Sequence, residues 1–452
     1  MKTITLDIKR KMLSMVLLVA VPLLAVSCSM MHEDYEPMPD MLGDSYVSVT
    51  VSAGSREATT RGPQGGEDGD GREDATENEY KISNLTLLLY KGGNNGINSD
   101  DNPTIEHAIY FSSFNVTENG TGGYDNKTYS TFTKKLDDGI ERAVYHVIAI
   151  ANAGDKTSLK GLALSSVRNH IITEQWKAAA SINDYTDFVM TSEEDATIDM
   201  TTGEGSFDYP FKATIDVERL AARIDFDISG GYYHSDVNGD YYEYDVEGSD
   251  NDCYRLKSIT VKKMLTSGSY LIKRVANAVN GTGLSYLGEE TSDANNVATN
   301  YVLDPWTCSK ISTDKPDKLI YSDSDIISVK GEVREIDTEK FFTLAYTQEN
   351  TLPNADNKAT YATALEFTGE YISNGTSKGV STVTYYIRHS DPDNKTDETS
   401  PMKYGIVRNN IYRVKVSKVN KQDPATPEGS ALLDLNIKVK KWHVETHPEI
   451  VM

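Results

Sequence analysis

Residues 431–440 read ALLDLNIKVK, a stretch with the alternation of a β-strand. Its apolar side chains recur at every second position among polar ones, so one face of the strand should be buried: Leu433, Leu435, Ile437 and Val439. The preceding residues 421–430, KQDPATPEGS, are polar and contain two prolines, which is typical of a linker. A terminal strand on a linker can pair within its own sheet or complete the sheet of a neighbouring molecule.

The parity of the apolar positions changes just after this stretch. Trp442 and Val444 occupy even positions, whereas the earlier apolar residues occupy odd ones. A one-residue shift moves side chains to the other face of a strand. The change therefore predicts a bulge or turn at Lys440–Lys441 that leads into a second short segment.

Composition limits the classes of partner and fold. The chain of 452 residues has 45 Lys and Arg against 68 Asp and Glu, a formal net charge of −23. This charge argues against nucleic acid as a partner, because binding phosphates requires positive side chains. The length predicts two or three domains, and 27 Tyr against 10 Phe suits strands joined by polar turns.

The N-terminus has the features of a targeting segment. Lys9, Arg10 and Lys11 precede the apolar run MLSMVLLVAVPLLAV, which ends before Ser27 and Cys28. This order predicts a signal peptide over residues 1–27, and the run is shorter than the ~20 residues of a membrane-spanning helix. Residues 25–28 resemble the lipobox of bacterial lipoproteins, which makes Cys28 the expected lipidation site. The acidic stretch at 32–34 resembles signals that send lipoproteins to the cell surface.

A second alternating strand is followed by an arginine-containing loop. In SYVSVTVSA (45–53), Val47, Val49 and Val51 share one face. Residues 54–79 are rich in Gly, Glu and Asp without an apolar period, so an exposed loop is expected over the whole stretch. Arginines at 56, 61 and 72 lie in it, and exposed loops are preferred sites of proteolysis.

The rest of the chain predicts a mainly β protein. Strand patterns occur at 80–90, 141–154 and repeatedly from about residue 211, and near-helical spacing predicts one helix from Ser158 to about Ala180. We expect two tandem β-sandwich domains, transthyretin-like or Greek-key, with the helix in the first. The boundary is expected near residue 230, within GGYYHSDVNGDYY. The expected division is 1–27 signal peptide, 28–61 lipidated propeptide with the first strand, 62–230 and 231–420 sandwich domains, and 421–452 linker and terminal strand.

The sequence predicts no catalytic site, metal site or cofactor. The GxSxG pattern at 375–379 is followed by a strand pattern rather than the helix of a nucleophile elbow. The carboxylate spacing at 236–247 resembles a calcium loop, but Tyr241 stands where the turn requires glycine. Cys253 and Cys308 would remain after lipidation of Cys28; a disulfide and two buried thiols are both compatible with an exported chain.

Several segments, in this order, resemble the fimbrillin superfamily, the type V pilins of Bacteroidia. They are the lipobox at Cys28, Arg61 before YKISNLTLLLY (80–90), VYHVIAIANAG (144–154), FVMTS (188–192), VERLAARIDF (217–226), AYTQENT (345–351), ATALEFTGEY (362–371), VRNNIYRVKV (407–416) and KVKKWHVE (438–445). AYTQENT, VRNNIYRV and the late Trp442 resemble most the major subunit of minor fimbriae (Mfa-type).

The resemblance implies a non-enzymatic shaft subunit of a fimbria that supports adhesion and biofilm formation. The lipoprotein would reach the outer membrane and then the cell-surface fimbrium. An Arg-specific protease would cut between Arg61 and Gly62, and the first strand, with Val47, Val49 and Val51, would be lost. The C-terminal strand of the next subunit would fill the groove, with donor residues Leu433, Leu435, Ile437, Val439, Trp442 and Val444.

The partners implied are identical subunits in a head-to-tail filament, fimbrial anchor and accessory tip subunits, the protease, and the lipid anchor during export. Three alternatives stay open. The chain could be the anchor or tip subunit of the same organelle, the Tyr-rich stretch could make it a surface glycan-binding lipoprotein, or the last strand could fold back on its own domain.

Overall fold

The computed structural model describes residues 43–52, 72–92, 101–119, 126–136, 140–192, 196–237, 239–272, 275–279, 283–286, 320–324, 327–328, 332–336, 339–350, 352, 358–388, 404–421 and 433–443. One compact unit comprises Asp44–Asp137 and Ala143–Met452, and it contains all the described strands.

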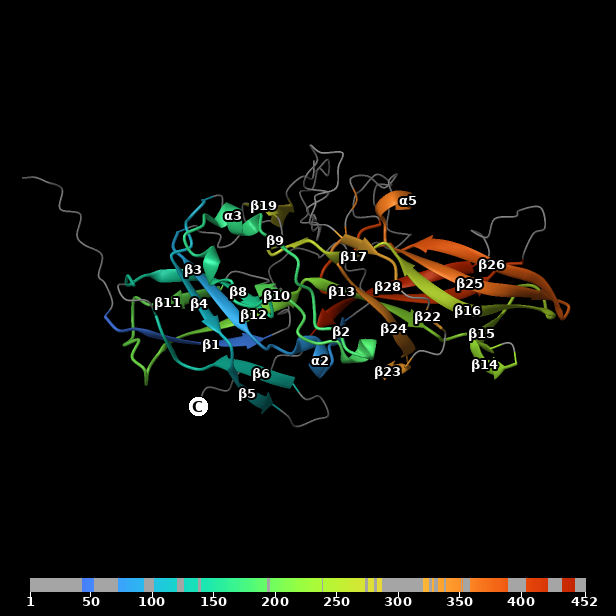
Figure 1. The fold of residues 1–452 in the computed structure, drawn as a ribbon, viewed down its shortest axis with the longest axis horizontal. Coiled ribbons are helices and arrows are strands. Elements are labelled where there is room, and N and C mark those ends of the chain that lie inside the picture. The colour runs from blue at the N-terminus through green and yellow to red at the C-terminus, as the bar shows by residue number, and fades with distance from the viewer. Residues whose placement is uncertain are drawn as a thin grey trace, which may run out of the picture. The chain divides into compact units, whose positions relative to one another are not determined.

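A ten-stranded sheet forms the first half of this unit (Figure 1). Its main path is β4 (His107–Phe111), β3 (Leu85–Tyr90), β8 (Val144–Ala151), β10 (Met190–Ser192), β12 (Phe211–Arg219), β1 (Tyr46–Ser52), β6 (Asn126–Thr131) and β5 (Phe114–Asn119). Off this path, β11 (Ala196–Asp199) pairs with β8 and β7 (Lys134–Lys135) pairs with β1. β12 connects the two halves of the sheet, because its first six residues pair with β1 and its last three with β10.

Two six-stranded sheets follow. The β27 sheet has the order β2 (Arg72–Asp74), β28 (Leu433–His443), β27 (Asn410–Val419), β13 (Ala221–Asp227), β24 (Glu339–Gln348) and β23 (Arg334–Ile336). The β16 sheet has the order β14 (Tyr232–Asp236), β15 (Gly239–Asp245), β16 (Asp252–Lys262), β25 (Ala364–Ser373) and β26 (Thr376–Tyr386), with β22 (Ile327–Ser328) on β16. Three small pairs complete the strands: β9 (Ile171–Ile172) with β18 (Ser269–Tyr270), β17 (Met264–Ser267) with β21 (Ile320–Ser322), and β19 (Val275–Val279) with β20 (Gly283–Tyr286).

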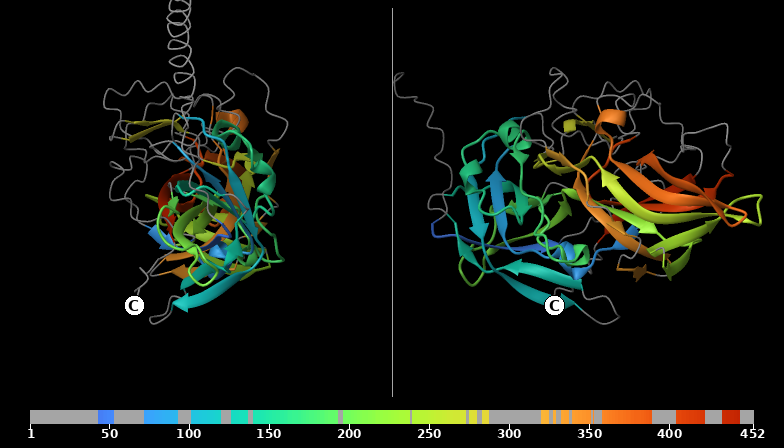
Figure 2. Two further views of the ribbon diagram at one scale, coloured as in Figure 1. Left: turned by 90° about the vertical axis from the view of Figure 1, so that its left-hand side faces the viewer. Right: turned by 45° about the vertical axis from the view of Figure 1, so that its right-hand side comes forward.

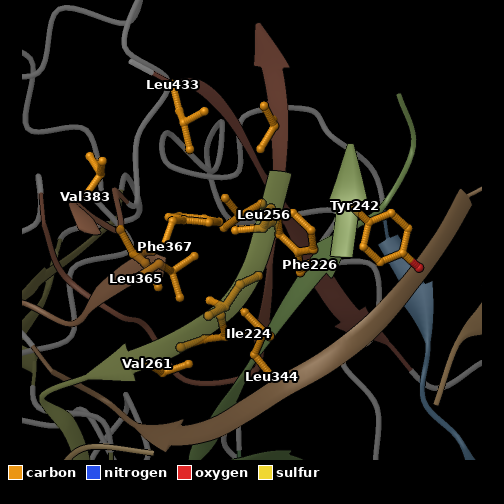
Figure 3. Packing of buried hydrophobic residues seen from close by; sticks show 14 of the residues in the cluster. Ile224, Phe226, Tyr242, Leu256, Val261, Leu344, Leu365, Phe367, Val383 and Leu433 are labelled. Carbon is orange, nitrogen blue, oxygen red and sulfur yellow. The ribbon is translucent and has the colours of Figure 1, made fainter. Parts of the chain in front are cut away.

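The two six-stranded sheets enclose one apolar core. Ile224, Phe226 and Leu344 of the β27 sheet and Leu256 and Phe367 of the β16 sheet are buried in the same cluster. Figure 3 shows these side chains directed toward one another, with Leu433 of β28 at the edge of the group. Alternating inward positions from both sheets make this a β-sandwich. The expected fold class, mainly β with sandwich packing, is confirmed.

The helix expected from Ser158 to Ala180 is wrong. This stretch holds the 3-10 turn η2 (Thr157–Leu159), the five-residue α3 (Leu164–Arg168) and β9. Gly161, with φ +83°, separates the first two, and Ala163 at the start of α3 makes no side-chain cap hydrogen bond. Leu164 and Val167 are buried in one core cluster. The near-helical spacing of the apolar residues therefore arises from short elements that pack on the same core, not from one long helix.

Part of the expected exposed loop at 54–79 is also wrong. Arg72–Asp74 form β2, and Glu77–Tyr80 form the short helix α2, with Glu73 and Glu79 buried. The partners of these glutamates lie far away in the sequence, which is why composition alone indicated a loop. Thr76 and Glu79 form a capping box, in which the Thr76 N–H donates to Glu79 Oε2 at 2.8 Å.

The change from the ten-stranded sheet to the β27 sheet falls at Leu220, between β12 and β13. The domain boundary expected near residue 230 stays a prediction; the Tyr-rich stretch there forms the β14–β15 hairpin. The remaining short helices are η3 (Ile182–Asp184) and α5 (Lys358–Tyr361). Within the described ranges, none of the helices has the length and apolar character needed to cross a membrane.

Candidate strand-exchange site

β1 occupies an interior position in the ten-stranded sheet. It pairs in parallel with β12, from Val47 beside Phe211 to Ser52 beside Asp216. On its other side it pairs antiparallel with β6 and β7, and the right-hand view of Figure 2 shows β1 in dark blue running beside β6. Val47, Val49 and Val51 are at most 1 % exposed, as their alternation predicts. The N-terminal strand of the described chain therefore fills a slot between strands from later in the sequence.

Hydrogen bonds hold the start of β1. The Tyr46 N–H donates to the Gly205 carbonyl at 2.7 Å, and the Leu136 N–H donates to the Ser45 carbonyl at 2.7 Å. Asp44 forms an ion pair with Lys135 at 2.8 Å, but both side chains are largely exposed, so this pair adds little.

Side chains of the neighbouring strand also bind β1. The Thr131 hydroxyl accepts a hydrogen bond from the Val49 N–H at 2.9 Å, and Ser48 Oγ donates to the Thr131 carbonyl at 3.1 Å. These contacts are made by backbone atoms and small polar groups. Another strand with apolar residues facing inward could form the same backbone contacts.

β28, the expected donor strand, lies in its own sheet in this single chain. It pairs antiparallel with β27 from Leu433 to Lys441. Leu433 is buried, and Leu435 and Ile437 pack against the core of the sandwich. The Leu433 N–H also donates to Tyr385 Oη at 3.0 Å. The alternative in which the last strand folds back on its own domain thus describes this chain by itself, and donation to a neighbour stays a prediction.

The bulge expected at Lys440–Lys441 is wrong. β28 continues through both residues to His443, and the irregularity in its pairing lies between Val416 and Lys418 of β27. The pairing of β28 with β27 ends at Lys441, beside Asn410, and the last residues of β28 pair in parallel with β2. The change in the parity of the apolar positions therefore coincides with the start of pairing to β2 and not with a bulge.

Several expected site residues cannot be placed. Cys28, Arg61, Gly62, Val444 and Cys308 lie outside the described residues, as does Arg56. Val439 and Trp442 are placed in β28 by their backbone only. Arg72, the third arginine of the expected loop, is the first residue of β2.

A buried cluster of charges joins β2 and α2 to the β27 sheet. We call it the arginine cluster: Arg219, Arg223, Arg334 and Arg413 with Glu73, Glu79, Asp225 and Glu339. The residue types alone do not predict that these side chains are buried, because arginine is rarely fully buried and only when it is paired.

Arg223 lies at the centre of the arginine cluster. Its guanidinium donates to Glu73, to Glu79 Oε1 at 2.9 Å and to Asp225 Oδ1 at 3.0 Å. The side chains of Arg223, Glu73 and Glu79 are at most 2 % exposed. Three carboxylates around one guanidinium satisfy its donors in a region that water does not reach.

Arg413 makes a second junction. It contacts Glu73 Oε2 at 2.6 Å and Asp225 Oδ2 at 2.9 Å, and it also pairs with Glu339. Its guanidinium lies 3.4 Å from the centre of the Phe341 ring. Glu73 therefore bridges Arg223 on β13 and Arg413 on β27.

Glu79 accepts several hydrogen bonds, and three of them end on its Oε1 atom. Besides Arg223, Arg334 donates to it at 3.2 Å and Tyr346 Oη at 2.9 Å, while Arg219 Nε donates to its backbone carbonyl at 2.7 Å. Burial alone would raise the pKa of the Glu79 carboxyl, but Arg223 and Arg334 lower it well below its ordinary value. Burial likewise opposes the charge of Arg223, yet Asp225, Glu79 and Glu73 hold the pKa of its guanidinium well above the ordinary value.

Sequence reasoning missed the arginine cluster. The available signal was local: Thr76-Glu77-Asn78-Glu79 has the pattern of a capping box and predicts the start of a helix within the supposed loop. The long-range pairing of Glu73 and Glu79 with β13 and β27 has no sequence signature.

Other candidate features have simpler placements. Cys253 is a half-buried free cysteine in β16, and burial raises the pKa of its thiol to about 11; its pairing with Cys308 stays a prediction. Tyr232 and Tyr233 of the hairpin are exposed, whereas Tyr242 and Tyr244 are buried in the core. Among the residues that the structure describes, no group of His, Cys, Asp and Glu could hold a metal ion.

The chain is similar to known fimbrial proteins. Residues 377–447 match the family model described as major fimbrial subunit protein type IV, fimbrillin, C-terminal. This match confirms the resemblance to fimbrillins for that part of the chain; the narrower resemblance to the minor-fimbria subunit stays a prediction. No protein of curated function matches the sequence.

Solved structures give weaker similarities. A cell adhesion protein of Parabacteroides distasonis is 14 % identical, with 89 % of this chain and 99 % of that chain covered and a TM-score of 0.44. Fimbrilin (fimA) of Porphyromonas gingivalis is 14 % identical over 89 % and 99 %, with a TM-score of 0.39. The tip fimbrial protein Mfa3 of Porphyromonas gingivalis is 11 % identical over 88 % and 100 %, with a TM-score of 0.37. With TM-scores below 0.5, these similarities carry no functional conclusion.

Proposed function

From the premise that residues 377–447 are fimbrillin-like, we propose that this protein is a structural shaft subunit of a cell-surface fimbria, polymerised by exchange of strands between subunits. The observation that carries the proposal is the interior position of β1, an N-terminal strand held between β12 and β6 with its three valines buried.

The proposed sequence of events begins with export. The precursor is lipidated at Cys28 and carried to the outer membrane. An Arg-specific protease then cuts after Arg61, which separates β1 covalently from the rest of the subunit. Loss of β1 exposes the unpaired backbone of β12 and an apolar trench, both of which favour pairing with a new strand.

β28 has the pattern required of that new strand. β1 alternates Val47, Val49 and Val51 with hydroxyl residues, and β28 alternates Leu433, Leu435 and Ile437 with polar residues. Relative to a solvent-exposed strand, burying three aliphatic side chains in the trench stabilises the contact by on the order of 5–9 kcal/mol before the ordering cost. The strand must leave β27 of its own subunit, so exchange also requires that its cis pairing opens.

The contact would be heterologous, because the slot and the donor strand are different surfaces of the same chain. Such contacts do not close on themselves and build open filaments. Anchor and accessory tip subunits would terminate the filament. An anchor that kept its lipid would keep β1 as well, so processing distinguishes a shaft subunit from an anchor.

The test uses the purified full-length precursor and an Arg-specific protease. We expect filaments by negative-stain microscopy and a new N-terminus at Gly62. Arg56→Ala with Arg61→Ala should block filaments, because cleavage after either arginine would release β1, while Arg56→Ala alone serves as the matched control and should assemble normally. A precursor that is cut after Arg61 but remains monomeric at high concentration would contradict the proposal.

A further inference from the structure

We propose that residues 72–80, which contain β2 and α2, form a clasp that keeps β28 in its own sheet and that remains on the sandwich of the β27 and β16 sheets after β1 is removed. The effect on assembly rests on the proposed function; the effect on β28 within one chain does not.

The clasp supplies half of the negative charge in the arginine cluster. Asp225 lies on β13 and Glu339 on β24, whereas Glu73 and Glu79 come from residues 72–80. With the clasp in place, four arginines face four carboxylates. Without it, the same four arginines would keep two of these carboxylates in a buried region. Removing one partner of a buried ion pair is strongly unfavourable, so the clasp should stay seated.

Glu73 couples this charge pairing directly to β28. Its side chain contacts Arg223 and Arg413, and its backbone position is paired with Trp442. β2 pairs with Lys441–His443, and β27 pairs with β28 only as far as Lys441. The last residues of β28 are therefore held by a strand that is itself fixed by buried ion pairs.

A second contact links β28 to the same cluster. Lys438 Nζ of β28 lies 2.8 Å from Glu339 Oε1, and the other oxygen of Glu339 pairs with Arg413. Arg413 also contacts Glu73 of β2. The Arg413 guanidinium therefore connects the ion pair of Lys438 with Glu339 to the ion pairs of Glu73. Opening of β28 should thus be coupled to loss of order in the clasp.

The clasp also restricts processing. Cleavage after Arg56 or Arg61 leaves residues 72–80 attached to the rest of the subunit. Cleavage after Arg72 would cut within β2, where the backbone is paired with Lys441. Proteases need an extended, accessible segment, so we expect Arg72 to be resistant in the folded precursor.

The first experiment measures β28 without any polymerisation. Amide hydrogen exchange of the intact precursor is followed by mass spectrometry on peptides that cover 433–443. Glu73→Gln should speed exchange there by about tenfold or more, because the strand opens more often, while peptides from β8 stay unchanged. The matched control is Glu243→Gln, which removes a half-buried partner of Arg255 elsewhere in the same sandwich. Exchange in 433–443 within about twofold of wild type would overturn the clasp.

A second variant guards against misfolding of Glu73→Gln. Asp74→Cys with His443→Cys, in a background with Cys253→Ser and Cys308→Ser, joins the paired positions of β2 and β28. After processing, the oxidised chain should remain monomeric, and reduction should restore filaments. Oxidised chains that assemble as fast as reduced ones would overturn the clasp. Absence of filaments from the processed wild type would instead count against the proposed function. The amide hydrogen exchange of residues 433–443 would then still test whether the clasp holds β28.

Discussion

Gly205 is a single residue on which the start of β1 depends. Its backbone has φ +61°, a conformation that favours glycine, and its carbonyl accepts the hydrogen bond from Tyr46. A Cβ at this position would lie 2.1 Å from Phe211 Cε2. Phe211 is paired with Val47, so any shift of its ring is transmitted to the first buried valine of β1.

Gly205→Ala should therefore weaken the seating of β1. We expect a loss of about 1–3 kcal/mol in the free energy of unfolding, measured by urea denaturation. Gly230→Ala is the matched control, because Gly230 has φ +89° and a methyl group added there would meet no atom within 4 Å. Equal losses for the two variants would mean that backbone strain alone, and not the contact with Phe211, sets the cost.

Glu79 gives the arginine cluster a defined pH response. Its pKa is held below the ordinary value of 4.5, so the folded state binds fewer protons than the unfolded state near that pH. Its stabilisation is present above about pH 4.5 and is lost as the pH falls toward the folded pKa. The free energy of unfolding should decrease on acidification below that value.

Glu79→Gln should flatten this response. The variant should be less stable at neutral pH by about 3–5 kcal/mol, because Arg223 and Arg334 lose a buried partner. Its unfolding free energy should then change less between neutral and acidic pH than that of wild type. Urea titrations at a series of pH values test this, and parallel curves for the two proteins would show that Glu79 is not a source of the pH dependence.

At the scale of elements, alternation predicted the strands well. β1, β3, β8 and β28 all lie where the period of two indicated them, because each buries one or both faces against a sheet. The short elements between Thr157 and Ile172 were not predictable in this way, and periodicity wrongly indicated one helix over 158–180. Two short elements that bury Leu164, Val167 and Ile172 on one core give a spacing close to that of a helix.

The donor role of β28 can be tested on its two half-buried side chains. Leu435→Ser with Ile437→Ser removes apolar area that the slot is expected to bury, so filament formation after processing should fall sharply. Each side chain contributes about 1.5–3 kcal/mol when fully buried. Asn436→Ser, on the exposed face, is the control and should assemble like wild type. Circular dichroism of the uncut chains checks that each variant still folds, and normal filaments from the double variant would rule out this donor face.

At the scale of the whole molecule, the sequence predicted a mainly β chain but not which segments from its two ends meet. β2 pairs with β28, and Glu73 contacts Arg223, 150 residues later. Such pairing depends on tertiary contacts between distant strands, and neither local propensity nor periodicity carries that information. For the candidate site, the sequence predicted the two alternating strands near the ends of the chain. It did not predict that β1 lies between β12 and β6.

The most direct measurement of strand exchange is a cryo-electron microscopy structure of filaments formed by the processed protein. Strand exchange predicts that the strand beside Phe211–Asp216 of β12 belongs to the C-terminal segment of the adjoining subunit, and that residues 46–52 are absent. Filaments in which every subunit keeps its own β1 in the slot and its own β28 on β27 would contradict it.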